Sequence, residues 1–200
     1  SIDNQDFSIL RIVSNAVREM SEGELLQLAK ARRLDITEEV YFDIIRQKTA
    51  SLISSCCAVG ARSAGAADEL VDKMKQFGEK VGLAFQIKDD LFDFGDAEVG
   101  KPLGIDIKEK KMTLPLIHAL SQTTWSKKRH IINIIKNHSD KPQKVAEVIQ
   151  FVRESGGIQY ATQAMQKHVE EAKSILHSFP ESAYRTSLEG LVQFTIDRSK

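Results

Sequence analysis

The sequence predicts an all-α protein, and three observations support this prediction. Apolar residues recur at helical spacing along most of the chain, and no segment alternates apolar and polar residues with β-branched enrichment. Short clusters of Gly, Pro, Asn and Ser separate the periodic segments. The 200 residues are enough for one domain with a sizeable core. We therefore expect a single helical domain without an internal linker.

The composition narrows the class of protein. Lys and Arg number 28, as do Asp and Glu, so the net charge is zero and no nucleic-acid-binding protein is indicated. The apolar runs are too short to cross a bilayer, and there is no signal-peptide pattern. The two cysteines, Cys56 and Cys57, are adjacent, which is poor disulfide geometry. We expect reduced thiols and a cytoplasmic location.

The first helix is expected at residues 6–28. Glu24 lies four residues after Met20, close to the apolar face, and its other interpretation is an exposed glutamate at the edge of that face. Thr37 is a good N-cap for the next helix, which has Glu38 and Glu39 in its first turn. The apolar face of the first helix comprises Ile9, Val13, Ala16, Val17 and Met20, continued by Leu25 and Leu28.

The second helix is expected at residues 38–61 and carries Lys48 and Thr49 on or beside its apolar stripe, where a lysine is unexpected. The pair indicates either a polar site or a lysine whose stem covers apolar surface next to a core threonine. The stripe itself comprises Ile45, Thr49, Leu52, Cys56 and Val59.

The third helix is expected to begin with Asp68 as its cap and to end near Gly95. Its last turns place one amide and three carboxylates on a single face, and Gly78 and Gly82 on that face would let a neighbouring helix approach closely. That polar face comprises Gln86, Asp89, Asp90 and Asp93, and an apolar stripe beside it comprises Leu83, Ile87, Leu91 and Phe94.

Asp89 and Asp93 are helical neighbours whose charges repel unless a cation lies between them. Mg²⁺, which binds one or two carboxylates together with substrate phosphates, fits best, with Mn²⁺ as an alternative. A solvated acidic face is the other interpretation of the three aspartates.

An irregular, lysine-rich segment at residues 96–112 follows the carboxylates. Its cations would suit a polyanion that a metal bridges to the aspartates, although a plain solvated connection has the same composition. Thr113 caps the next helix, with Pro115 in its first turn. The lysines are Lys101, Lys108, Lys110 and Lys111, and further helices are expected at 126–137, 142–154, 158–178 and 182–198.

These features, in this order, resemble the trans-isoprenyl diphosphate synthases, or polyprenyl synthetases. Residues 85–93 resemble the second aspartate-rich motif of the family, and Lys48-Thr49 resembles its Lys-Thr pair. Gly100-Lys101, Gly104-x-Asp106 and Lys111-x-Thr113-Leu114-Pro115 resemble its loop and helix start, and Gly23-Glu24-x-x-Gln27 its Gly-Glu motif. The resemblance spans essentially the whole chain and implies an isoprenoid-synthase-like helical bundle.

The resemblance implies transfer of an allylic group to isopentenyl diphosphate with release of diphosphate, in the manner of a long-chain, octaprenyl-type synthase. Asp89, Asp90 and Asp93 would hold Mg²⁺, with Asp89 the best candidate for a direct ligand. Lys48, Lys101 and Lys111 would bind diphosphate, and Asp106 would orient the loop lysines. The Lys48 carbonyl, Thr49 and Gln86 would face the allylic cation, and Phe85 would line the site.

The family's first aspartate-rich motif and its upstream basic site do not occur in this sequence. We therefore expect residues 1–200 to be the C-terminal part of one synthase domain, without the N-terminal helices and inactive alone. We also expect a homodimer and an open groove bordered by Ile45, Leu52, Leu83 and Ile87. Three alternatives remain open: a non-catalytic subunit that binds a catalytic partner, a terpene cyclase, and a helical interaction module.

Overall fold

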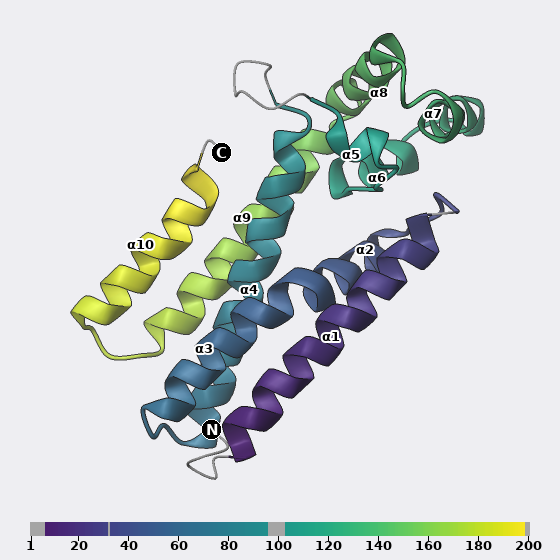
Figure 1. The fold of residues 1–200 in the computed structure, drawn as a ribbon. Coiled ribbons are helices and arrows are strands. Elements are labelled where there is room, and N and C mark those ends of the chain that lie inside the picture. Colours follow the sequence, from purple (N-terminus) through teal and green to yellow (C-terminus); the bar gives the residue numbers. More distant parts are fainter. Residues whose placement is uncertain (1–6, 32, 96–102, 199–200) are drawn as a thin grey trace. The chain divides into compact units, whose positions relative to one another are not determined.

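Helices make up all the regular structure in the part of the chain that the structure describes. The structure is a computed structural model that describes residues 7–31, 33–95 and 103–198 (Figure 1). The helices are α1 (Phe7–Ala31), α2 (Glu38–Ile45), the π-helical turn η1 (Arg46–Ala50), α3 (Ser51–Ser63), α4 (Asp68–Phe92), α5 (Ile105–Lys108), α6 (Leu114–Ser121), α7 (Trp125–Asn137), α8 (Pro142–Glu154), α9 (Gly157–His177) and α10 (Ala183–Asp197). The predicted all-α class is confirmed.

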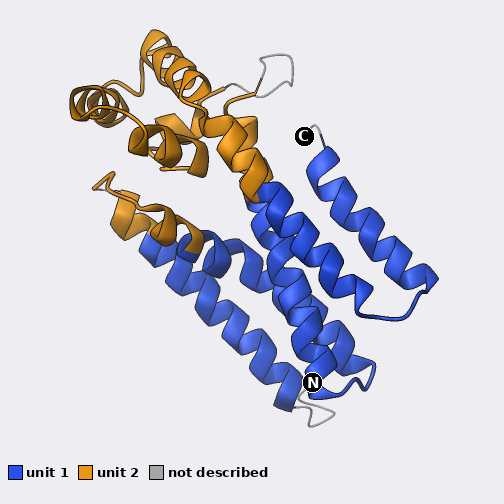
Figure 2. Cartoon of the chain, turned by 180° about the vertical axis from the view of Figure 1, so that it is seen from behind, with its two compact units in different colours: residues 1–26, 43–86, 165–198 blue, residues 27–42, 87–164, 199–200 orange. Residues whose placement is uncertain are grey.

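The chain divides into two compact units (Figure 2). Unit 1 consists of residues 1–26, 43–86 and 165–198. Unit 2 consists of residues 27–42, 87–164 and 199–200. Helix α4 contributes to both, since it enters unit 2 at residue 87.

Within unit 1, α4 packs closely against η1 and α3 because two of its positions are glycine. A Cβ atom on Gly82 would lie 2.5 Å from Ala50 Cα, and one on Gly78 would lie 2.7 Å from Ser54 Cα. Ser54 donates its hydroxyl proton to the Lys75 carbonyl at 2.7 Å across the same contact. The close approach that the sequence predicts at both glycines is confirmed.

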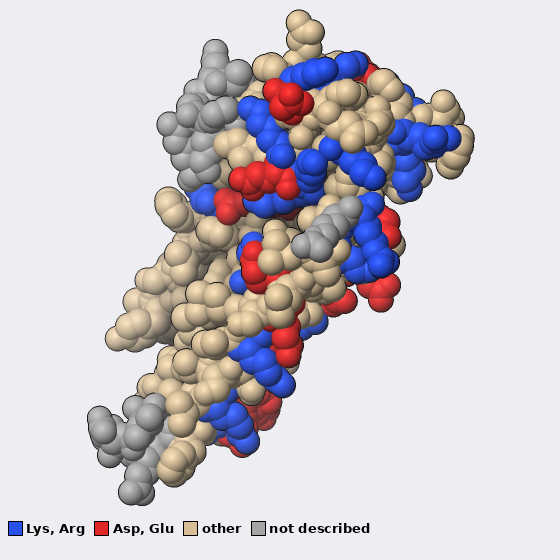
Figure 3. Space-filling view, turned by 45° about the vertical axis from the view of Figure 1, so that its right-hand side comes forward, with Lys and Arg blue, Asp and Glu red and all other residues tan. Residues whose placement is uncertain are grey.

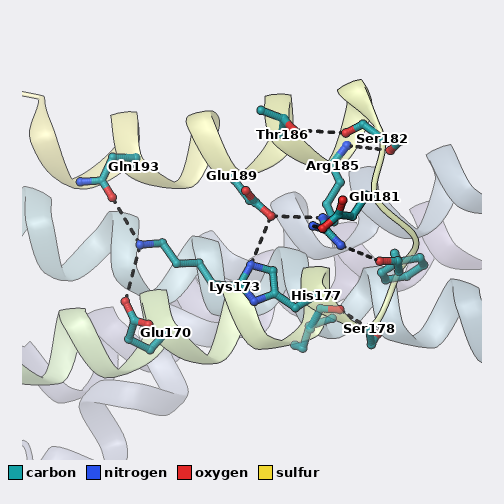
Figure 4. Close-up of polar contacts among 12 residues, drawn as sticks. Glu170, Lys173, His177, Ser178, Glu181, Ser182, Arg185, Thr186, Glu189 and Gln193 are labelled. Atoms are coloured by element: carbon teal, nitrogen blue, oxygen red, sulfur yellow. Dashed lines mark hydrogen bonds and ion pairs between the residues drawn. The ribbon is translucent and has the colours of Figure 1, made fainter.

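Polar side chains join α9 to its neighbours in unit 1. Lys80 of α4 pairs with Glu171 of α9 at 2.8 Å. Figure 4 shows the contacts between α9 and α10, where His177 lies 3.2 Å from Glu189 and Lys173 donates a hydrogen bond of 3.4 Å to Gln193 Oε1. These contacts hold α10 in a defined register along α9.

Unit 2 has its own apolar core, formed largely by α6, α7 and α8. Tyr160 of α9 stacks on His118 of α6 with ring centroids 4.0 Å apart, and it donates its hydroxyl proton to Glu38 of α2 at 2.7 Å. Fully or nearly fully buried members of this core are Leu114, Leu116, Ile131, Ile134, Ile135, Val148 and Val152.

Helix α1 buries only part of the predicted apolar face. Val13, Val17 and Leu25 are 46%, 59% and 66% exposed, whereas Ala16 and Gly23 are buried. A Cβ atom on Gly23 would lie 2.7 Å from the backbone nitrogen of Lys48, so only glycine fits at this position without a shift of the backbone. The predicted apolar face is therefore correct at Ala16 and wrong at Val13, Val17 and Leu25, which are exposed.

The predicted helix at 38–61 is interrupted by the π-helical turn η1, which contains Lys48 and Thr49. A π turn inserts one extra residue and shifts the faces of the helix that follows. Leu52 and Cys56 are consequently exposed, in contrast to the predicted stripe.

The expected open groove is also not found. Three of its four predicted border residues, Ile45, Leu83 and Ile87, are at most 5% exposed. Leu52 is the exception, at 48%. The apolar sides of these helices are covered by the chain itself, so the groove prediction was wrong.

Several helix ends differ from their predicted positions. Asp68 is the first residue of α4 and pairs with Arg62 instead of capping the helix. Helix α4 ends at Phe92, before Gly95, and the short helix α5 lies in the segment expected to be irregular. Thr113 takes the N-cap position of α6, but its hydroxyl makes no capping hydrogen bond. The bounds of α7 to α10 agree with the predictions to within one residue.

No helix among the described residues is long and apolar enough to cross a membrane.

Candidate active site

Thr49 and Gln86, which the family resemblance assigns to one site, are hydrogen-bonded to each other in unit 1. The Thr49 hydroxyl donates a hydrogen bond of 2.8 Å to Gln86 Oε1. Thr49 lies in the π-helical turn, and Gln86 lies on the facing side of α4, where Gly82 allows close approach. The bond brings two uncharged oxygens, each with lone pairs, next to each other.

Lys48, the neighbour of Thr49, pairs with Glu24 of α1. Its Nζ lies 2.7 Å from Glu24 Oε2, and both side chains are partly exposed, at 37% and 46%. Gly23 permits the approach of α1 to η1 that this ion pair requires. Glu24 therefore has a polar partner, and the Gly-Glu and Lys-Thr motifs, which are far apart in sequence, lie side by side.

Phe85 is covered by a residue from the C-terminal end of the described chain. The Arg198 guanidinium lies 4.0 Å from the Phe85 ring centroid, and Arg198 donates a hydrogen bond of 3.3 Å to the Phe85 carbonyl. A cation over an aromatic face is favourable, so Arg198 fixes both the ring and the backbone at this turn of α4.

In unit 2, Asp90 is a buried carboxylate with a tyrosine donor. Tyr41 of α2 donates its hydroxyl proton to Asp90 Oδ2 at 2.7 Å. Asp90 is 6% exposed and Tyr41 is 4% exposed. Burial, followed by the negative charge of Asp90, raises the pKa of Tyr41 well above its ordinary value, so the phenol stays protonated and remains a donor.

Asp93 receives backbone hydrogen bonds at both carboxylate oxygens. The Ile105 and Asp106 N–H groups donate to it at 2.8 and 3.1 Å. Burial, together with the nearby charge of Asp106, raises the pKa of Asp93 to about 6, although the backbone donors act in the opposite direction. Asp93 therefore anchors the start of α5 to the end of α4.

Lys111 is held by two carboxylates at the end of the lysine-rich segment. Its Nζ lies 3.2 Å from Asp106 Oδ1 and 2.5 Å from Glu109 Oε2. Burial acts to lower the pKa of Lys111, but bonding to Glu109 and the charge of Asp106 outweigh it and raise the pKa. The predicted orienting contact between Asp106 and a loop lysine is thus present.

The three aspartates differ in how they fit a cation. Among the described residues, no three His, Cys, Asp or Glu side chains form a group arranged to hold a metal. Asp90 and Asp93 are buried and accept protein hydrogen bonds, whereas Asp89 is partly exposed. Mg²⁺ is often held by one or two carboxylates plus phosphates, so Asp89 fits as a protein ligand of a phosphate-bound ion. Ligation by all three stays a prediction.

Lys101 lies outside the described residues. Three further polar residues contact α4 or the turn that follows it: Tyr41 and Arg153, which were not singled out from the sequence, and Arg198. Arg153 of α8 donates to the carbonyls of Phe94 and Gly95 at 3.0 and 2.5 Å and so holds the turn after α4. Each contact joins residues at least 49 positions apart, which no local pattern reveals.

A family model and several known polyprenyl or isoprenyl diphosphate synthases match this chain. The polyprenyl synthetase family model matches residues 2–152. A short chain isoprenyl diphosphate synthase of Methanothermobacter thermautotrophicus is 35% identical over 191 residues, which are 94% of this chain and 58% of that protein. An octaprenyl diphosphate synthase of Escherichia coli is 31% identical over 194 residues, which are 96% and 60% of the two chains.

A crystal structure shares the fold. It is that of polyprenyl synthase from Caulobacter crescentus complexed with calcium and isoprenyl diphosphate, which is 30% identical. It superposes with a TM-score of 0.91 over 100% of this chain and 61% of that one. The chain spans about three fifths of the length of these relatives. With the family model matched over residues 2–152, the chain belongs to the polyprenyl synthetase family.

Proposed function

We propose that the protein containing this chain condenses isopentenyl diphosphate with an allylic diphosphate to make a longer polyprenyl diphosphate. One observation carries the proposal. Consecutive turns of α4 present Gln86, bonded to Thr49, and then the sequence Asp89-Asp90-x-x-Asp93. A neutral oxygen pair suits a carbocation, and carboxylates suit a metal-bound diphosphate. The similarity to isoprenyl and octaprenyl diphosphate synthases supports the same chemistry.

The allylic cation that forms as diphosphate leaves needs negative dipoles but no strong nucleophile. The Thr49 proton is directed to Gln86 Oε1, which leaves the Thr49 lone pairs for the cation. Neither oxygen carries a full charge, so neither should trap the cation as a covalent adduct. The Lys48 carbonyl would add a third dipole, and Phe85, fixed by Arg198, would line the site and exclude water.

The leaving diphosphate needs positive charge. Mg²⁺, or Mn²⁺ in its place, would supply it when bound, with Asp89 as its protein ligand and Asp90 and Asp93 as further candidates. Lys48, Lys101 and Lys111 would bind the diphosphate oxygens. Lys48 and Lys111 would exchange their present carboxylate partners for the substrate. The calcium and isoprenyl diphosphate bound to the Caulobacter relative support this ligand chemistry.

Residues 1–200 are proposed to form the C-terminal part of one synthase domain and to be inactive alone. The sequence lacks the family's first aspartate-rich motif, and with it half of the expected metal ligands. A non-catalytic subunit that acts with a catalytic partner is the alternative. We also propose a cytoplasmic location, because the two cysteines are adjacent in the sequence and so do not suit a disulfide framework.

Binding of inorganic diphosphate tests the role of Asp89 without requiring turnover. We expect the chain to bind diphosphate only when Mg²⁺ is present, and Asp89→Ala to weaken this binding at least about tenfold, because a lost charged ligand costs about 1.4 kcal/mol or more. Asp72→Ala is the matched control, since Asp72 is an exposed aspartate on the same helix. Isothermal titration calorimetry measures both. Equal binding by the parent and Asp89→Ala would remove Asp89 from the metal site.

A further inference from the structure

We propose that the outward face of α7 is a docking surface for an anionic lipid membrane. The inference does not depend on the proposed catalytic function, because it rests on a helix that contributes no residue to the candidate active site. Figure 3 shows in blue where Lys and Arg side chains gather on the surface. Helix α7 belongs to unit 2. The surface is defined by Trp125, Lys128, Arg129, Asn133 and Lys136, which are all exposed.

The spacing of these residues makes one continuous stripe. They occupy positions i, i+3, i+4, i+8 and i+11 of α7, which is one side of an α-helix. The opposite side carries Ile131, Ile134 and Ile135, all buried in the core of unit 2. The cationic stripe therefore cannot turn inward, and it extends about 16 Å along the helix.

The charged residues of α7 are all basic. The helix contains four Lys or Arg residues and one His but no Asp or Glu, in a chain whose net charge is zero. Glu147, the acidic residue that contacts α7, is already bonded to His130 at 2.6 Å and to Lys144 at 2.8 Å. Within the described residues, no ion pair joins Lys128, Arg129 or Lys136 to a carboxylate.

Further cations lie next to the stripe. The Lys110 Nζ donates a hydrogen bond of 3.0 Å to the Lys136 carbonyl and so adds positive charge at the C-terminal end of α7. Lys141 follows in the next turn and is exposed. Asp140 is the single acidic residue between positions 125 and 146. The local potential is therefore positive although the whole chain is neutral.

Trp125 distinguishes this face from an ordinary solvated helix. Its side chain is 70% exposed at the first residue of α7, and the Arg129 guanidinium lies 4.6 Å from its ring centroid. An exposed indole beside cations is the combination that partitions into the headgroup region of a bilayer, where the ring is half-buried and the cations contact lipid phosphates. An indole ring exposed to water contributes little burial energy to the stability of the fold, so its exposure favours a role at the surface.

A membrane fits this surface better than a nucleic acid does. Nucleic-acid-binding domains generally have an isoelectric point above about 9, whereas that of this chain is about 7.0. A straight, short stripe on an outer helix can lie flat on a planar surface. Because α7 buries its own isoleucines in the protein, binding would depend on charge and on one indole, so it should be reversible and salt-sensitive.

Tryptophan fluorescence offers a direct test because Trp125 is the only tryptophan in the chain. The 200-residue chain is titrated with phosphatidylcholine vesicles with and without phosphatidylglycerol at low salt. We expect a blue shift of Trp125 emission and co-sedimentation with the anionic vesicles alone. Each basic residue near a membrane contributes about fivefold in partitioning. The triple variant Lys128→Gln/Arg129→Gln/Lys136→Gln should therefore bind at least about tenfold more weakly.

The matched control removes three exposed cations elsewhere. The variant Arg11→Gln/Arg18→Gln/Lys167→Gln, on α1 and α9, should bind anionic vesicles as tightly as the parent. Circular dichroism verifies that both triple variants are folded, and all their substitutions lie at exposed positions.

Three results would overturn the proposal. The first is no emission shift and no co-sedimentation of the parent with anionic vesicles. The second is equal binding by the α7 variant and the control. The third is binding of single-stranded RNA by the parent, lost in the α7 variant, under conditions where anionic vesicles are not bound; this would identify the face as a nucleic-acid surface instead.

Discussion

At the scale of single residues, buried polar contacts decide how the acidic end of α4 is held. The Tyr41 hydroxyl is bonded to Asp90 in an environment where both side chains are at most 6% exposed. A buried carboxylate that loses its donor bears the full cost of its desolvation. Tyr41 therefore acts as a positioning residue for this end of the helix.

Tyr41→Phe tests that role by removing only the hydroxyl. We expect the free energy of unfolding to fall by about 1–3 kcal/mol, because Asp90 is left without this hydrogen bond. Urea denaturation followed by circular dichroism measures the change. Tyr184→Phe is the matched control, since the Tyr184 side chain is 84% exposed, and it should leave stability unchanged. Equal effects of the two variants would mean that the bond to Asp90 contributes nothing to stability.

His168 on α9 couples stability to pH. Its side chain is 13% exposed, and burial, together with the positive charge of Lys80, lowers its pKa from 6.5 although Glu171 opposes the shift. The unfolded chain then binds the proton more readily than the folded one. The free energy of unfolding contributed by this group must therefore fall as the pH drops below 6.5 toward the lowered folded pKa.

The corresponding variant is His168→Gln, which cannot be protonated. Between pH 7 and pH 5 it should lose less of its unfolding free energy than the parent, whereas at pH 8 both forms carry a neutral side chain at this position. Urea midpoints at the three pH values give the comparison. If the parent and His168→Gln lose the same amount, the titration of His168 is not linked to folding.

At the scale of elements, the contact between α4 and η1 requires an unusually close approach of two helices. The π-helical turn presents Thr49 to Gln86, and this requires Ala50 and Gly82 to approach more closely than any larger pair allows. The same turn shifts α3, so that Leu52 and Cys56 face outward. The polar pair and the exposed stripe of α3 thus have one common cause.

Gly82→Ala tests the close approach. An added Cβ atom would lie 2.5 Å from Ala50 Cα, so we expect destabilisation by about 1–3 kcal/mol from overpacking. Gly190→Ala is the matched control, because nothing lies within 4 Å of its Cβ position on α10. This change should stabilise by up to about 1 kcal/mol through helix propensity. Thermal denaturation reports both, and a stabilising Gly82→Ala would contradict the packing described for α4 and η1.

At the scale of the whole molecule, we propose that the chain forms a symmetric dimer through α1. Val13, Val17 and Leu25 leave a row of exposed apolar side chains on that helix, and contiguous patches of this kind commonly mark an interface. The covered groove once expected beside Ile45 and Leu83 offers no such surface.

Sedimentation equilibrium at micromolar concentration measures the dimer. We expect twice the chain mass of 22.4 kDa for the parent, and a shift toward the monomer for Val17→Asp because a charge would be buried in the interface. Leu191→Asp on α10, at a position 54% exposed, is the control and should remain dimeric. A parent that sediments as a single 22.4 kDa species would refute the dimer.

The sequence by itself determined the helical class, most of the helix bounds and the family. Helical periodicity and the Gly and Pro breaks are local, so the bounds of α7 to α10 follow from them to within one residue. Gly78 and Gly82 likewise predicted where helices approach closely, because glycine destabilises a helix interior and is expected there mainly where packing leaves no room for a side chain. The family resemblance singled out Thr49 and Gln86, but their hydrogen bond to each other was found only in the structure.

Only the tertiary structure decided which helix faces and which aspartates are buried. The register after η1 depends on one extra residue in a π turn, which has no local sequence signal. On α1, Gly23 is buried by a close contact with η1 that the hydrophobic pattern did not predict. The bonds of Asp90 to Tyr41 and of Asp93 to the start of α5 join separate segments. Such contacts depend on how distant segments of the chain come together, and the periodicity of a single helix does not predict this.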